Sequence, residues 1–211
     1  MELFKYDSPF MTGFRRVVDY MFLGLLWVIA SLPILTFGAA TAAALRTAEV
    51  SIRQNDGGIF KPFWSYFRQE FKQATILWII ELPVLEFVLV DLLIVRYLKV
   101  PAMVQILIIV MCLLAFCWLQ LWFGYQSRIK DKIGMVLLNT FRMTMSNFGR
   151  TLLMAVLTVV CIVGAYFALF LLPPLLLIIP GTYITVYTYL LRKIFARYKT
   201  ADDEVQAEAT E

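Results

Sequence analysis

The stretch that decides the fold is LWVIASLPILTFGAATAAAL, residues 26–45, an apolar segment with a proline near its middle. Proline has no backbone N–H and its ring crowds the carbonyl four residues earlier, so a helix through this segment is expected to kink or break at Pro33. Ser31 and Thr36 flank the break and can hydrogen-bond the carbonyls that it frees. The segment is therefore typical of a membrane helix that is interrupted halfway.

The half that follows the proline is built from small residues. Glycine and alanine recur four positions apart, as in Gly38 and Ala42, and this spacing lets the backbone of another helix approach closely. We expect the face from Gly38 to Ala44 to pack on protein. Two structures satisfy the pattern: a kinked helix that crosses the membrane within a bundle, and a broken or re-entrant helix that lines a polar path.

Composition places the chain in a membrane. The 211 residues are 61% hydrophobic and 16% charged, and the mean hydropathy is +0.78, far above that of a soluble domain. The net charge of +4 does not indicate nucleic-acid binding, because the basic residues flank hydrophobic segments. Histidine is absent from the sequence, and Cys112, Cys117 and Cys161 match no metal or redox motif, so we expect neither a metal nor another cofactor.

Hydropathy predicts an all-α integral membrane protein with a single membrane domain, residues 1–199. The five predicted spans cover about 17–45, 73–95, 101–125, 151–172 and 175–195. Amphipathic elbow helices at the interface are predicted at about 59–72 and 136–149, and each precedes a pair of spans, so a tandem elbow-hairpin repeat is possible. Residues 200–211 are acidic and small, which predicts a disordered tail.

Both predicted elbows carry aromatic rings on one face and bases on the other. In the first, the aromatic positions recur every three or four residues and the bases lie opposite; the residues are Phe60, Trp64, Phe67 and Phe71, with Arg68 and Lys72. In the second, Phe141 and Phe148 share a face and Arg142 lies opposite. Such helices place aromatic rings at the level of the lipid headgroups or dock a partner.

Two motifs in the first half resemble those of the YesL family of small bacterial membrane proteins. The first runs from Leu26-Trp27 through Ser31-Leu32-Pro33-Ile34 to Thr36-x-Gly38-Ala39-x-Thr41-x-Ala43. The second is Phe63-Trp64-x-x-Phe67-x-x-x-Phe71-Lys72-Gln73-Ala74, followed by a hydrophobic segment with Trp78. The resemblance implies a polytopic protein of unestablished function, commonly encoded beside carbohydrate ABC importers and glycoside-degrading enzymes. It implies no catalytic residue.

Three carboxylates fall inside the predicted second span, where each costs roughly 2.5–3.5 kcal/mol on insertion scales. They are Glu81, Glu86 and Asp91, and we expect Glu86, nearest the middle, to be the most informative. Glu86 is either protonated or hydrogen-bonded to a partner such as Gln120, or it is a site that couples protons or cations. In the fifth span, Pro180-Gly181 is expected to break or kink the helix just before Thr182 and Thr185, whose hydroxyls can line a polar cavity or bond to their own helix.

Lys and Arg counts set the expected orientation. With five spans, the side that holds both elbows and the C-terminus carries fourteen of these residues and the other side five, so the C-terminus is expected to be cytoplasmic. If the first segment is instead a re-entrant hairpin, the N-terminus joins the same side and the count becomes seventeen to two.

The sequence predicts a non-enzymatic protein, because no nucleophile motif or phosphate-binding loop is present. The YesL resemblance implies that its membrane is a bacterial cytoplasmic membrane. The leading hypothesis is an accessory or scaffold protein that acts with an ABC-type carbohydrate uptake system. Its partners would be the lipid bilayer, importer permease subunits or a second copy, and not nucleic acid. The alternative is a small-solute transporter or channel in which Glu86 and the breaks at Pro33 and Pro180 line one polar path.

Overall fold

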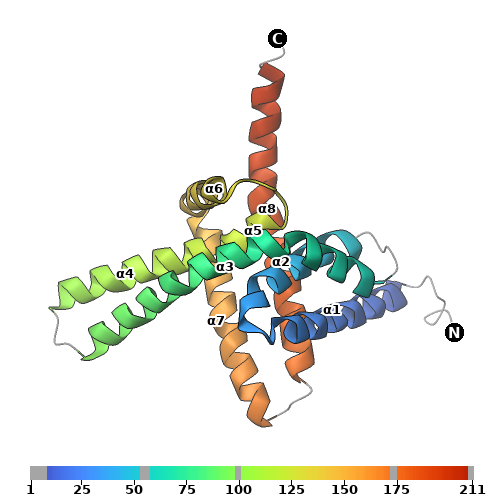
Figure 1. The fold of residues 1–211 in the computed structure, drawn as a ribbon, viewed down its shortest axis with the longest axis horizontal. Coiled ribbons are helices and arrows are strands. Elements are labelled where there is room, and N and C mark those ends of the chain that lie inside the picture. The colour runs from blue at the N-terminus through green and yellow to red at the C-terminus, as the bar shows by residue number, and fades with distance from the viewer. Residues whose placement is uncertain (1–8, 53–57, 98–100, 172–174, 209–211) are drawn as a thin grey trace.

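The computed structural model describes residues 9–52, 58–97, 101–171 and 175–208 (Figure 1), and within these ranges every regular element is a helix. The elements in chain order are α1 (Pro9–Ser31), η1 (Ile34–Thr36), α2 (Phe37–Thr47), η2 (Ala48–Ile52), α3 (Phe60–Tyr97), α4 (Ala102–Leu119), α5 (Leu121–Gln126), α6 (Ile133–Ser146), α7 (Phe148–Leu171) and α8 (Leu175–Glu208). The predicted all-α class is confirmed.

The predicted break at Pro33 reverses the direction of the chain. The Trp27 indole N–H donates to the Thr41 hydroxyl at 3.1 Å, although one continuous helix would separate these residues by about 21 Å. The Thr36 hydroxyl donates to the Ala30 carbonyl at 2.6 Å and so satisfies a group that the break leaves free. Residues 17–45 therefore form a helical hairpin of α1 and α2 and not one kinked crossing. The length of α2 agrees with this, since its 11 residues measure about 16 Å and a bilayer core is about 30 Å thick.

The small residues of α2 pack against α3. Gly38, Ala39, Ala42 and their neighbours up to Leu45 are buried. A Cβ added at Gly38 would lie 2.6 Å from the backbone oxygen of Ala74 and 2.8 Å from the Phe123 ring. The close approach that the small-residue spacing predicts is thus an intramolecular contact between α2 and α3.

Helix α3 continues without interruption from the first predicted elbow into the second predicted span. Its 38 residues make it about 57 Å long, almost twice the thickness of the hydrocarbon core. The elbow at 59–72 is thus the first part of a long helix, because no helix-breaking residue separates it from the span. The second elbow is a separate helix, since Asn147 leaves the helical conformation (φ −126°, ψ 36°) between α6 and α7. The two elbows therefore join their following spans differently, and the possible elbow-hairpin repeat does not extend to this junction.

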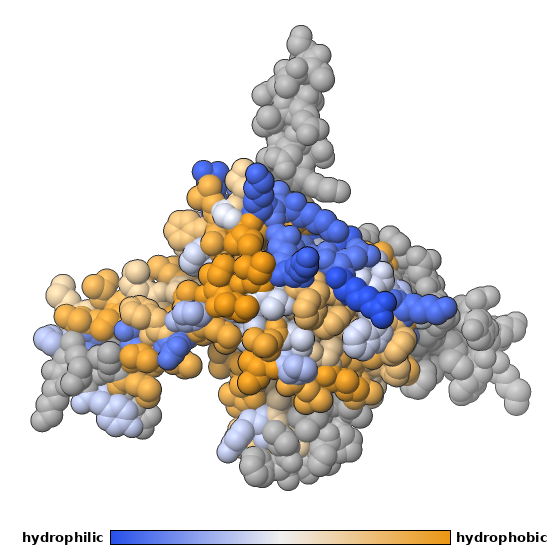
Figure 2. All heavy atoms as spheres, viewed as in Figure 1, coloured by the Kyte–Doolittle hydropathy of each residue, from blue (hydrophilic) through white to orange (hydrophobic). Residues whose placement is uncertain are grey.

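Two helical hairpins extend from the body of the molecule. Helices α3 and α4 lie side by side and project together, while α7 and α8 form a second pair that points in another direction in Figure 1. Three described helical stretches are long and apolar enough to cross a membrane, namely Phe60–Asp91, Ala102–Gln126 and Phe148–Ala168. Figure 2 shows hydrophobic surface over both hairpins and hydrophilic surface around the base of α8 and the start of α3.

Helix α8 continues to Glu208, whereas the sequence predicts disorder from residue 200. The segment contains no proline or glycine, and its alanine, glutamate and glutamine are compatible with a helix that has already started. Residues 209–211 lie outside the described part of the chain.

Candidate functional site

A cavity of about 460 Å³ lies where α1, α2, α3, α4, α5, α7 and α8 converge. Aromatic and aliphatic side chains make up most of its wall, among them Trp27, Phe37, Trp78 and Phe123. The rings of Phe37 and Trp78 lie 4.6 Å apart, and those of Trp78 and Phe123 lie 6.2 Å apart. The cavity is therefore a largely apolar chamber at the centre of the molecule.

Glu81 is the one acidic residue in the cavity wall, and the residues that line the cavity include no lysine or arginine. Its side chain is only 7% exposed. One of its carboxyl oxygens has no hydrogen-bond partner among the described residues. A buried polar atom without a partner costs free energy, so this oxygen is the chemically unsatisfied group of the cavity.

The other polar side chains of the cavity satisfy one another. The Thr158 hydroxyl donates to Gln120 Oε1 at 3.1 Å and lies 3.0 Å from the Tyr183 hydroxyl. The Tyr187 hydroxyl donates to the Gln120 backbone carbonyl. This chain of contacts joins α4, α7 and α8 across the cavity and leaves Glu81 outside it.

The structure brings three of the predicted site residues to this cavity, namely Glu81, Gln120 and Pro180. Glu86 is exposed, since positions 81 and 86 lie about 140° apart around a helix. Pro33 is also exposed, at the tip of the α1–α2 hairpin. The predicted path through Glu86, Pro33 and Pro180 is therefore not assembled. The predicted break at Pro180 is also wrong, because α8 continues through this proline as one helix.

The remaining predicted polar residues lie elsewhere. Asp91 is half-buried further along α3, and Thr182 is exposed on α8. The hydroxyls of Thr182 and Thr185 donate to their own helix, to the carbonyls of Ile179 and Gly181 at 2.9 and 2.8 Å. These two threonines are thus used within α8, which is one of the two roles that the sequence allows.

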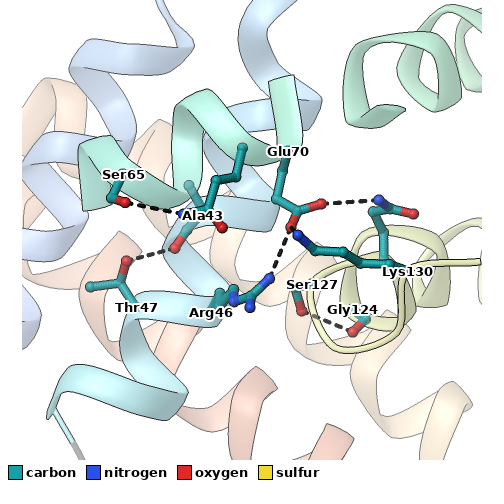
Figure 3. A network of polar contacts seen from close by, with 10 residues as sticks. Ala43, Arg46, Thr47, Ser65, Glu70, Gly124, Ser127 and Lys130 are labelled. Carbon is teal, nitrogen blue, oxygen red and sulfur yellow. Dashed lines mark hydrogen bonds and ion pairs between the residues drawn. The ribbon is translucent and has the colours of Figure 1, made fainter. Parts of the chain in front are cut away.

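A second cluster of polar contacts surrounds Glu70, which is only 2% exposed (Figure 3). Arg46 Nη1 on α2 donates to Glu70 Oε1 at 2.9 Å, and Gln126 Nε2 on α5 donates to Oε2 at 3.0 Å. Lys130 Nζ lies 3.9 Å from Oε1 and is largely exposed. One buried carboxylate therefore holds together α2, α3 and the connection that leads from α5 to α6.

Two further sets of contacts extend this cluster. Arg128 pairs with Glu49 at 2.9 Å and lies over the Phe195 ring of α8 at 4.7 Å. Burial lowers the pKa of the Arg128 guanidinium, and the nearby Glu49 carboxylate opposes that shift. The Tyr125 hydroxyl donates to Asp131 Oδ2 at 2.6 Å. The loop at 127–132 is thereby tied to α5, η2 and α8.

The aromatic residues of the first predicted elbow lie at the start of α3 and are partly exposed. Phe60 and Phe71 are exposed, and Trp64 and Phe67 are half-buried. Their rings follow one another at contact distance, with 5.3 Å between Trp64 and Phe67 and 5.5 Å between Phe67 and Phe71. The bases Arg68 and Lys72, and the predicted second-elbow residues Phe141, Arg142 and Phe148, are exposed.

The sequence prediction did not single out Glu70 or Gln126. The signal for Glu70 is its phase on α3, because it shares a stripe with Phe63, Ala74 and Leu77, all of which are buried. A carboxylate on such a stripe needs a partner inside the protein. The partner Gln126 comes from a distant helix, and no local pattern marks it.

Long apolar helices, exposed apolar hairpins and a buried polar cluster at one end together define an all-α membrane protein. Residues 20–92 match the model of a family described as "Protein of unknown function, DUF624", the family to which YesL belongs. The matched region includes most of the α1–α2 hairpin and most of α3, and it contains both motifs of the YesL resemblance. No curated protein and no solved structure matches the chain.

Proposed function

We propose that the protein is a non-catalytic membrane accessory or scaffold protein of the YesL type that acts with an ABC-type carbohydrate uptake system. The sugar-uptake context rests on the YesL resemblance, and the match of residues 20–92 to DUF624 supports that resemblance. The proposal includes contact with the lipid bilayer and with permease subunits of an importer.

The observation that carries this proposal is the Glu70 cluster, because its contacts hold together helices that also carry exposed aromatic and basic side chains. We use the name basal surface for the exposed residues of the two predicted elbows, which form two patches. Phe60, Arg68 and Lys72 lie at the start of α3, and Phe141 and Arg142 lie on α6. Glu70 lies on the same helix as Phe60, Arg68 and Lys72. The loop at 127–132 that leads into α6 is held by Asp131 and Arg128. Exposed aromatic rings and basic side chains on helices held by the Glu70 cluster suit the docking of a partner beside the lipid headgroups.

The predicted contact surfaces need one correction. The face from Gly38 to Ala44 is buried against α3, so it is not available to a partner. The exposed surfaces that remain for a partner or a second copy are the basal surface and the apolar sides of the two hairpins.

The hairpin of α1 and α2 also supports an orientation. If the α1–α2 hairpin enters the membrane from one side only, α1 begins on the same side as α3, which corresponds to the count of seventeen Lys and Arg against two. On this count we propose that both termini and the basal surface face the cytoplasm of a bacterial cell.

Copurification in mild detergent, with mass spectrometry of the recovered proteins, tests the scaffold function. We expect importer permeases in near-equal amount with the wild type, and their loss with the double variant Phe60→Ala/Arg68→Glu. Val160→Ala, which changes an exposed side chain of α7, is the matched control and should retain them. Recovery of the protein alone, or equal recovery with the double variant, would refute the proposal.

A further inference from the structure

The central cavity has the size and wall of a small-molecule site. Its volume of about 460 Å³ falls within the range of roughly 300–1,000 Å³ that such sites occupy. Ile162 lines the cavity and is nevertheless 63% exposed on α7. One residue of the cavity wall therefore also lies on the outer face of α7, the face from which a lipophilic compound in the bilayer would approach.

The polar groups of the cavity restrict what fits. Glu81 provides an oxygen without a partner, while the side chains of Gln120, Thr158 and Tyr183 already bond to one another. The cavity thus offers one acceptor for a hydrogen-bond donor and apolar surface elsewhere. A sugar would bring several hydroxyls, and each one left without a partner costs about 1–3 kcal/mol.

The charged residues of the cavity wall further restrict the class of ligand. Among the described residues that line the cavity, Glu81 is the only acidic one and none is basic, so an anionic ligand would find no positively charged partner. A cationic nitrogen would pair with the carboxylate, and its N–H groups would supply the missing hydrogen bond. The rings of Trp27, Phe37 and Trp78 provide faces that attract a cation and pack against an apolar body.

We propose that the Glu81 cavity binds a lipophilic amine, a compound with one ammonium group and an aromatic or aliphatic body. The ammonium donates to the unpartnered oxygen of Glu81, and the body lies among the aromatic residues contributed by α1, α2 and α3. This binding activity is inferred from the cavity and does not rest on the scaffold function, and the binding needs no partner at the basal surface.

The test uses the full-length protein in nanodiscs of phosphatidylcholine, with 4-(4-bromophenyl)butylamine as the probe. Bromine quenches tryptophan fluorescence on contact, and Trp27 and Trp78 line the cavity. We expect saturable quenching by the amine and binding weaker by about tenfold or more for the matching alcohol, because the alcohol lacks the charge. Empty nanodiscs correct for partition into lipid.

Three variants separate the site from nonspecific uptake. Glu81→Gln is expected to weaken amine binding about tenfold or more and to remove the preference for amine over alcohol. Glu86→Gln, the exposed carboxylate on the same helix, should bind like the wild type. Ala165→Leu, which fills the cavity with a larger side chain, should abolish saturable quenching even if Glu81→Gln fails to fold. Absence of saturable quenching in the wild type, or unchanged binding in a folded Glu81→Gln or Ala165→Leu variant, would overturn the proposal.

Discussion

Replacing Glu70 by alanine should strongly destabilise the protein, because three segments depend on this carboxylate. The change removes the hydrogen bond from Arg46, worth about 1.5–3 kcal/mol for a charged group, and leaves the buried Gln126 amide without its acceptor, at about 1–3 kcal/mol. Lys130 is 59% exposed, so its ion pair adds little. Arg46 is 27% exposed and regains some hydration. We therefore expect a loss of about 3 kcal/mol in the free energy of unfolding.

The measurement is equilibrium unfolding in mixed micelles, with SDS as the titrant and tryptophan fluorescence and far-UV circular dichroism as probes. Glu70→Gln should cost only about 1–2 kcal/mol. Its carbonyl can still accept from Arg46, and its new amide can donate to Gln126 Oε1, which has no partner among the described residues. Arg46→Met should lower the free energy of unfolding much less in the Glu70→Ala background than in the wild type, because the contact between Arg46 and Glu70 is already broken there.

Glu86→Ala is the control for Glu70→Ala, since it removes an exposed carboxylate from the same helix and should change stability by less than about 0.5 kcal/mol. A cost below about 1 kcal/mol for Glu70→Ala would refute the reasoning. It would mean that the cluster behaves as an ordinary surface ion pair and does not hold α2, α3 and α5 together.

Other contacts of the fold give three more predictions. Gly181→Ala places a Cβ against the backbone of Tyr20, 2.7 Å from its carbonyl carbon, and should lower the free energy of unfolding by about 1–3 kcal/mol. Gly164→Ala has room for its Cβ and should be neutral or stabilising in the same SDS titration. Tyr125→Phe removes the hydrogen bond to Asp131 and should lower the free energy of unfolding by about 1–2 kcal/mol; no change would show that this bond does not restrain the loop. Fluorescent-protein fusions at either terminus should fluoresce and phosphatase fusions should stay inactive; an active N-terminal phosphatase fusion would contradict the hairpin topology.

The helical class and the break at Pro33 could be predicted because they depend on local chemistry. Long apolar runs need helices in a membrane, and a proline removes a backbone N–H from a helix. The rule is not sufficient alone, because α3 and α8 continue through Pro83 and Pro180. The course of the chain beyond the break could not be decided locally. Whether α2 continues across or folds back onto α1 depends on contacts such as that between Trp27 and Thr41, fourteen positions apart.

The burial of Glu81, and not of Glu86, could have been predicted from the helical phase of α3. Depth in the span favours Glu86, but the buried positions Phe63, Glu70, Ala74, Leu77 and Glu81 follow one another at intervals of three, four or seven residues. Glu86 falls off this stripe and Glu81 lies on it. For a helix packed against protein on one side, phase decides burial more directly than depth does, because a carboxylate can lie at any depth and still face outward.

The same stripe joins the two polar features of the molecule. Glu70 and Glu81 are eleven positions apart, about 16 Å along α3. Arg46 lies on α2, which contributes Thr41 and Leu45 to the cavity wall, and Gln126 lies on α5, which contributes Phe123. The Glu70 cluster thus joins three of the helices that line the cavity, α2, α3 and α5. By linkage, a compound that binds only the assembled cavity must stabilise the assembled cluster, and loosening the cluster must weaken binding even though none of its residues lines the cavity.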